Sequence, residues 1–188
     1  MTETPHSTLR LRLQTETRAS HEDLDRTVSR FDLRTRDGFE LFLQMQSVAL
    51  RAIAPHAARS TIAECIDDLL ARAETDLRAI AAWAHRDAME VGSLHPLAID
   101  YVIAGSRLGT KVLRTRWLDA DDPDVRQADA YFSAPSYIEL WKSFCETANG
   151  MPSVGDVADQ IVCDADRIFK LYHMCALAPQ MTKGEVHA

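Results

Sequence analysis

His21 is the residue whose type and surroundings first suggest chemistry. It interrupts a helical stripe that otherwise holds apolar or small residues, namely Leu13, Thr17, Leu24 and Val28. A buried imidazole needs a partner for each ring nitrogen, and Asp25 lies one helical turn further on. A carboxylate that accepts a hydrogen bond from one ring nitrogen leaves the other free to bind a metal. A core histidine tied to a neighbouring acid would show the same spacing, and spacing alone favours that plainer interpretation.

Two glycines interrupt a second helical pattern, in the segment Gly105-Ser106-Arg107-Leu108-Gly109. An interior glycine destabilises a helix by about 1 kcal/mol relative to alanine, so a pair needs a reason. The two lie one turn apart on a face shared with Tyr101 and Val112. Without side chains the backbone can approach something flat or bulky, and the helix can bend. Close packing on another helix would use the same residues, so both interpretations stay open.

Other metal motifs fail because a ligand is missing. His21 and Glu22 begin a His-Glu-x-x-His zinc motif, but Asp25 stands where the second histidine belongs. Helical di-iron proteins need acid-x-x-His pairs on facing helices, and only Glu3 and His6 have that spacing. We expect free, buried thiols rather than a disulfide framework or a zinc site, because no Cys-x-x-Cys pair occurs among Cys65, Cys145, Cys163 and Cys175.

Helical periodicity extends through nearly all of the chain, and no alternating strand pattern interrupts it. The first expected helix begins at a cap on Ser7, ends at about Ser29 and carries His21. A turn over residues 31–36 should precede a second helix that contains Phe39 to Ile53. Residues 60–85 should form one long helix, or two shorter ones broken near 71–74.

The second half of the chain contains three more expected features. A helix from about His95 to Leu118 carries the two glycines, and Pro135 suits the first turn of a helix that contains Trp141. Ser153 can cap a last helix, and the residues from about Pro179 should form a frayed tail. Together these elements predict an all-α fold, a single-domain helical bundle over residues 1–188 with an ordered core of about 7–178.

Composition and charge exclude several classes of protein. A chain of 188 residues with 46% hydrophobic and 26% charged residues has the composition of one soluble globular domain. A net charge of −7 argues against a surface for nucleic acid or anionic membranes. No apolar stretch approaches the roughly 20 residues needed to cross a bilayer. The first residues lack the features of a signal peptide, so we expect a cytoplasmic protein.

Taken together, these motifs resemble the bacterial biliverdin-producing haem oxygenases, particularly the type associated with bacteriophytochromes. The resemblance spans about Leu13 to Leu177. It rests on Leu13-Gln14-x-x-Thr17-x-x-x-His21-x-x-Leu24-Asp25, on residues 101–110 with the two glycines, and more weakly on Trp141-Lys142-Ser143-Phe144. The closing helix with Phe169 also fits. The resemblance implies a haem-oxygenase-like helical bundle that binds haem b as both cofactor and substrate.

The resemblance also assigns roles to individual residues. His21 would be the axial ligand to the haem iron, with Asp25 as its partner and Thr17 against the same face of the ring. Gly105 and Gly109 would let the distal helix lie over the iron, with Ser106 where many relatives use an aspartate to order water. Tyr101 and Phe169 would line the pocket. Lys142 would pair with a haem propionate, and Arg18 is a second candidate for that role.

The implied reaction cleaves haem to biliverdin, carbon monoxide and ferrous iron. It uses dioxygen and electrons from a donor such as a ferredoxin or a flavin reductase, and a bacteriophytochrome would be a possible acceptor of the biliverdin. The chain departs from the family at Thr110 and Ala104, where glycine and glutamate are usual, and at Gln14, where a basic residue is usual. Arg107 adds a long cation beside the distal motif. These departures suit an alternative, a haem-binding sensor or carrier without turnover, and a helical interaction domain without haem is a third hypothesis.

Overall fold

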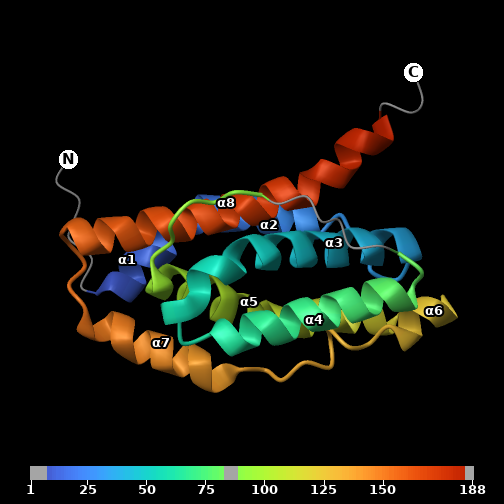
Figure 1. Cartoon of the computed structure of the whole chain (residues 1–188), viewed down its shortest axis with the longest axis horizontal. Coiled ribbons are helices and arrows are strands. Elements are labelled where there is room, and N and C mark those ends of the chain that lie inside the picture. The colour runs from blue at the N-terminus through green and yellow to red at the C-terminus, as the bar shows by residue number, and fades with distance from the viewer. Residues whose placement is uncertain (1–7, 83–88, 185–188) are drawn as a thin grey trace.

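The computed structural model describes residues 8–82 and 89–184, and every regular element within them is a helix (Figure 1). The elements in chain order are α1 (Leu9–Glu16), α2 (Arg18–Val28), α3 (Arg36–Ile53), the short 3-10 helix η1 (Ala54–Arg59), α4 (Ala63–Ala79), α5 (Pro96–Leu118), α6 (Pro123–Gln127), α7 (Ile138–Gly150) and α8 (Asp156–Gly184). Within the described residues, no helix is both long enough and apolar enough to span a bilayer.

One hydrophobic core holds these helices together. The longest helix, α8, packs against α1, α2, α3 and α5, and Figure 1 shows it along one edge of the molecule with its last turns projecting beyond the packed helices. Phe39 and Phe42, one turn apart on α3, stack on Phe132 at ring-centroid distances of 6.0 and 5.6 Å. Such aromatic pairs add to the free energy gained by burying the rings themselves. The expected all-helical single domain is confirmed.

The first expected helix is broken at Thr17, one turn before His21. The Thr17 hydroxyl donates a hydrogen bond to the Leu13 carbonyl oxygen at 2.8 Å, and Thr17 separates α1 from α2 with φ −94° and ψ 1°. A threonine that bonds back to its own helix bends that helix. The N-cap of α1 is Thr8, which accepts a hydrogen bond from the Leu11 amide, while the expected cap Ser7 lies outside the described residues.

In the middle of the chain, the possible break near residues 71–74 is absent, so the alternative of a single helix is correct there, whereas the expected helix start at Pro135 is wrong. Helix α4 continues through residues 71–74 without a break, supported by good helix formers and by an Arg72–Asp68 ion pair of 2.7 Å. Helix α7 begins only at Ile138, after Pro135, because Tyr137 adopts a left-handed backbone conformation with φ 51°. Tyr137 is held there by a hydrogen bond from its hydroxyl to Asp68, a contact that sequence periodicity cannot reveal.

The boundaries of α8 also differ from expectation. Ser153 does not cap it, because Gly155 has φ 104° and the helix starts at the next residue, Asp156. At its other end α8 continues through Pro179 to Gly184, in place of the frayed tail expected there. The residues Ala176, Leu177 and Ala178 are strong helix formers, which favours continuation of the helix at this point.

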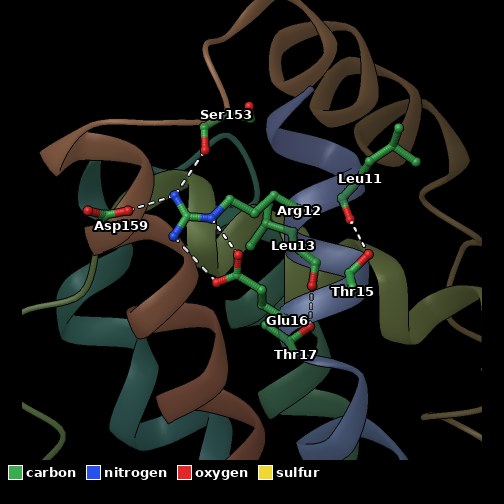
Figure 2. Close-up of polar contacts among 8 residues, drawn as sticks. All are labelled: Leu11, Arg12, Leu13, Thr15, Glu16, Thr17, Ser153 and Asp159. Atoms are coloured by element: carbon green, nitrogen blue, oxygen red, sulfur yellow. Dashed lines mark hydrogen bonds and ion pairs between the residues drawn. The ribbon is translucent and has the colours of Figure 1, made fainter. Parts of the chain in front are cut away.

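A single arginine joins α1 to the start of α8, as Figure 2 shows. One terminal nitrogen of Arg12 donates hydrogen bonds to a carboxylate oxygen of Asp159 at 2.6 Å and to the Ser153 carbonyl at 2.9 Å. Its Nε donates to Glu16 at 2.7 Å. The Arg12 side chain is only 16% exposed, so these bonds are partly shielded from water. Arg12 therefore fixes the helix that precedes His21 against the longest helix of the fold.

Replacing Arg12 with alanine should lower the free energy of unfolding by about 1–2 kcal/mol, because charge-assisted hydrogen bonds in a partly shielded site exceed ordinary surface pairs. Urea denaturation measures this loss. The matched control is Arg26→Ala, which removes an exposed pair with Asp23 and should leave the unfolding midpoint nearly unchanged. Equal losses in the two variants would contradict the role assigned to Arg12.

Candidate functional site

Helix α2 lies alongside α8 and points in the same direction. The Ser20 hydroxyl contacts the Asp166 carboxylate, and the Thr27 hydroxyl lies 3.0 Å from Nε2 of His173. The partners on both helices rise together in residue number, so the two helices are parallel. His21 and Asp25 lie between these two attachment points.

Helix α5 is parallel to α8 as well. The His95 amide, at the cap of α5, donates to the Asp164 carboxylate at 2.8 Å, and the Tyr101 ring meets the Phe169 ring edge-on at 6.2 Å. The His21 ring lies on the same Phe169, with 5.1 Å between centroids. Phe169 therefore marks the place on α8 where residues of α2 and α5 approach one another.

Direct contacts join α2 and α5 at two places. Near the start of α2, the hydroxyl oxygens of Thr17 and Tyr101 are 3.4 Å apart. Near the end of α5, Arg116 donates to the carbonyl oxygens of Ser29 at 3.2 Å and of Phe31 at 2.6 Å. Each helix covers roughly 20 Å between these contacts, by the rise of an α-helix. The stretches between these two contacts therefore lie at the same height along the two helices. They contain His21 and Asp25 on α2 and the two glycines on α5. We call these residues, together with Phe169, the α2–α5 surface.

The His21 ring lies at the molecular surface, not in the core. Its side chain is 53% exposed, so the interpretation as a core histidine is wrong. Nε2 is 3.6 Å from Asp25, within ion-pair distance but longer than a hydrogen bond. Within the described part of the chain, the ring's only polar contact is this one through Nε2, so Nδ1 has no hydrogen-bond partner. The ring thus rests on Phe169 and has one nitrogen available to a ligand.

Tyr101 connects several of the expected pocket residues. Its ring lies 6.2 Å from Trp141, 5.3 Å from Phe144 and 6.2 Å from Phe169. Burial raises the pKa of Tyr101, so the phenol keeps its proton. Because the Thr17 hydroxyl already donates to a carbonyl, the Tyr101 hydroxyl is the donor in their contact. The structure therefore brings Thr17, His21, Tyr101 and Phe169 together.

The two glycines of α5 have different surroundings. A Cβ atom on Gly105 would lie 3.2 Å from the Trp141 ring, so Gly105 allows α7 to pack closely on α5. This is the close-packing interpretation that the spacing left open. A Cβ atom on Gly109 would meet nothing within 4 Å. Beside Gly109, the apolar side chains of Leu108 and Val112 are 47% and 67% exposed. The open part of the α2–α5 surface is therefore at Gly109.

The remaining residues of the glycine segment face their own helix or the core. The Ser106 hydroxyl donates to the Ile103 carbonyl at 2.8 Å, and Thr110 donates to the Ser106 carbonyl at 3.3 Å. Arg107 is buried, with its guanidinium 5.4 Å from the Tyr131 ring centroid. It points away from the glycine face because it lies on the opposite side of the helix.

The two cations expected at the site are bound elsewhere. Lys142 pairs with Glu139 at 2.7 Å, and Arg18 pairs with Glu22 at 2.6 Å. Both pairs lie on the surface of a single helix and are well exposed. The structure does not bring either cation to His21. The acids at i+4 and i−3 were visible in the sequence and could have indicated these partners.

Within the described part of the chain, His21 does not belong to a larger cluster of metal ligands. Residues 8–82 and 89–184 contain no group of three or more His, Cys, Asp or Glu side chains placed to hold a metal ion. Glu3 and His6 lie outside these residues. All four cysteines are free; Cys65 and Cys175 are buried as expected, whereas Cys145 is half-buried and Cys163 is exposed. The site offers one imidazole with an acidic neighbour, which suits a metal that brings its other ligands with it.

Sequence reasoning missed two features of this site. Trp141 belongs to one of the quoted motifs, but nothing in the spacing indicated that its ring covers Gly105. The bond from Arg116 to the end of α2 joins residues 85 and 87 positions apart and has no local signal. Comparison with known proteins adds no relative, since no family model, curated protein or solved structure matches this chain.

Proposed function

We propose that this protein is a haem oxygenase with a haem-oxygenase-like helical bundle. The observation that carries the proposal is the position of His21, a half-exposed imidazole with a free nitrogen, at the level of a glycine-containing stretch of α5. Haem, when bound, supplies the iron that activates dioxygen and the ring that is opened to biliverdin, carbon monoxide and ferrous iron. A ferredoxin or a flavin reductase would supply electrons, and a bacteriophytochrome is a candidate acceptor for the biliverdin.

The residues of the α2–α5 surface fit such a group. A haem ring is flat and apolar, and it needs one axial ligand from the protein. His21 offers the ligand, Phe169 lies directly beside its ring, and Leu108 and Val112 offer exposed apolar surface. The space around Gly109 has no side chain to obstruct a flat ligand.

Each residue then has a physical task. His21 would hold the iron, and Asp25, which lies 3.6 Å from Nε2, would orient the imidazole and raise its donor strength once it accepts a hydrogen bond from the ring. The phenol of Tyr101 and the ring of Phe169 would line the haem pocket and exclude water from it. The backbone at Gly109 would leave room for dioxygen, because no side chain lies within 4 Å of an added Cβ there, whereas Gly105 is covered by the Trp141 ring. Thr17 fixes the start of α2 and, through Tyr101, its distance from α5.

The propionates of haem need cationic partners. Lys142 and Arg18 would have to exchange their present partners, Glu139 and Glu22, for a propionate. Exposed ion pairs contribute little to stability, so this exchange is inexpensive. We therefore retain both residues as proposed partners of haem, with a side-chain rearrangement on binding.

A second function, a haem-binding sensor or carrier without turnover, is favoured by one observation. The Ser106 hydroxyl donates to its own helix at Ile103, and Thr110 donates to the Ser106 carbonyl. Both hydroxyl hydrogens are therefore already used within the helix, and neither is available to donate to a water molecule at the oxygen-binding site. An oxygenase needs such a proton source near the site of oxygen binding, whereas a carrier does not.

A haemin titration followed by one reductive turnover separates these functions. An oxygenase should show a Soret band on binding, and that band should give way to the absorption of biliverdin once a reductant and dioxygen are supplied. A ferrous complex that persists without biliverdin would contradict the enzyme and support the carrier. No spectral change with haemin would contradict both.

A pair of glycine variants tests where the ligand lies. Gly109→Leu should weaken haemin binding by about tenfold or more, because the leucine would occupy the open part of the α2–α5 surface. Gly150→Leu is the matched control, since Gly150 also has nothing within 4 Å of an added Cβ but lies at the end of α7. Unchanged binding in Gly109→Leu, or equal weakening in both variants, would place the ligand elsewhere.

A further inference from the structure

A surface pocket of about 530 Å³ lies at a junction of three chain segments, away from His21. Its walls come from η1, from the segment that leads into α5, and from the first half of α8. They consist of His56, Ala58, Arg59, Ser93, Leu94, His95, Pro96, Gln160 and Asp164. The volume is within the range of pockets that bind small molecules.

The acidic side of this pocket is already neutralised and fixed. The buried Asp164 carboxylate accepts hydrogen bonds from the His95 amide at 2.8 Å, from Gln160 at 2.9 Å and from Arg167 at 2.8 Å. Arg167 also donates to the Ser93 carbonyl at 3.2 Å. These bonds hold the segment before α5 against α8. The wall of the pocket is therefore set before any ligand arrives, which reduces the ordering that binding requires.

The lining of the pocket also contains hydrogen-bond donors. Nδ1 of His95 accepts a hydrogen bond from the Leu97 amide at 3.1 Å, so the proton of the neutral ring is on Nε2. Burial lowers the pKa of His95, which keeps the ring in this neutral form near pH 7. Arg59 and His56 have no hydrogen-bond or ion-pair partner in residues 8–82 and 89–184, and the charge of Arg59 acts on the neighbouring His95 ring. A guanidinium, an Nε2–H donor and a second imidazole thus line one pocket.

We propose that this pocket binds a small organic anion, a molecule that carries a phosphate or carboxylate group, through Arg59, His95 and His56. The guanidinium can hold two oxygens of such a group at once. Leu94, Pro96 and Ala58 provide an apolar wall for the rest of the molecule. The site is separate from the proposed haem site, so its occupation does not depend on haem chemistry.

A second pocket, of about 430 Å³, also contains arginines but is less suited to bind an anion. Of its cations, Arg34 is paired with Asp32 at 2.8 Å, and Arg116 donates to two carbonyl oxygens. The pocket also lies at the C-terminal ends of α2 and α5, where helix dipoles repel anions. Arg30, on its rim, gives a matched control for Arg59.

The test is a titration of the full chain with inorganic phosphate, and separately with acetate, at constant ionic strength. We expect saturable shifts of the His56 and His95 side-chain NMR signals with at least one of the two anions. The anion that binds more tightly identifies the group that the ligand carries. Shifts that do not saturate, or that chloride reproduces, would overturn the proposal.

Variants connect the shifts to the named residues. Arg59→Gln should weaken binding by about tenfold or more, since it removes a charge-assisted contact. His56→Gln should weaken it less, and Arg30→Gln should bind as the unchanged protein does. Binding that is equal in Arg59→Gln and in the unchanged protein would overturn the proposal, and so would equal weakening in Arg59→Gln and Arg30→Gln. The measurement uses no haem, so its result does not depend on whether the protein is a haem oxygenase.

Discussion

His21→Ala should remove the Soret band of the haemin complex and weaken haemin binding roughly a hundredfold or more. The imidazole is the proposed bond between protein and iron, and loss of a mere supporting contact to a metal ligand already weakens binding by about 10–100-fold. The ring is 53% exposed, so its removal leaves no large cavity and the unfolding midpoint should change little. A haemin titration monitored by absorbance, with circular dichroism as a check on folding, measures both effects.

The matched control for this variant is His56→Ala, which removes a half-buried imidazole from a pocket whose lining includes neither His21 nor Phe169, and this variant should bind haemin normally. Added imidazole should restore a Soret band to His21→Ala, because the free base can occupy the vacated position on the iron. Asp25→Asn should have a smaller effect than His21→Ala, since the ring and the carboxylate are 3.6 Å apart. An unchanged Soret band in His21→Ala would contradict the ligation and, with it, the proposed function.

Gly38→Ala should lower the free energy of unfolding by about 3 kcal/mol or more, through a backbone clash. A Cβ atom at this position would lie 2.2 Å from the Asp32 carbonyl oxygen and 2.6 Å from its carbon. That carbonyl cannot move freely, because it accepts hydrogen bonds from the Thr35 amide at 3.0 Å and the Thr35 hydroxyl at 2.9 Å. The turn before α3 would therefore have to open. Urea denaturation gives the magnitude.

Gly150→Ala is the control for Gly38→Ala, because an added Cβ at Gly150 meets nothing within 4 Å. In a helical position, alanine should be neutral or slightly stabilising there. If Gly38→Ala unfolded at the same urea concentration as Gly150→Ala, the close approach of α3 to the preceding turn would be wrong.

The sequence predicts the helices well where periodicity alone decides them. The helix expected from about His95 to Leu118 is present as α5, with His95 as its cap. The boundaries fail where a distant or local side chain overrides the pattern. Thr17 divides the first helix by bonding to Leu13, and Tyr137 delays α7 through its contact with Asp68. Neither contact has a periodic signal, so neither could be predicted from spacing.

In the candidate site, too, some features could be predicted from the sequence and others depend on contacts between distant residues. Tyr101 and Phe169, which only the resemblance grouped with His21, are in contact with one another, and the Phe169 ring also contacts the His21 ring. The exposure of His21 was not predicted, because the stripe suggested a buried position and the break at Thr17 was not foreseen. The role of Gly105 was left open between two interpretations, and only the position of Trp141 distinguishes them.

The attachment of α5 to α2 at both ends restricts how this region can deform. The Tyr101–Thr17 contact and the Arg116 bonds to Ser29 and Phe31 act as two fixed supports, so the helices cannot separate as rigid rods. A ligand between the two helices would therefore have to be accommodated by bending of the helical segments between these contacts. A helix bows most easily where glycines occur, and α5 has both of its glycines in that span. The glycine-containing segment of α5, which would contact the ligand, is therefore also the segment that bends most easily. The two ends of α5 keep their positions relative to α2.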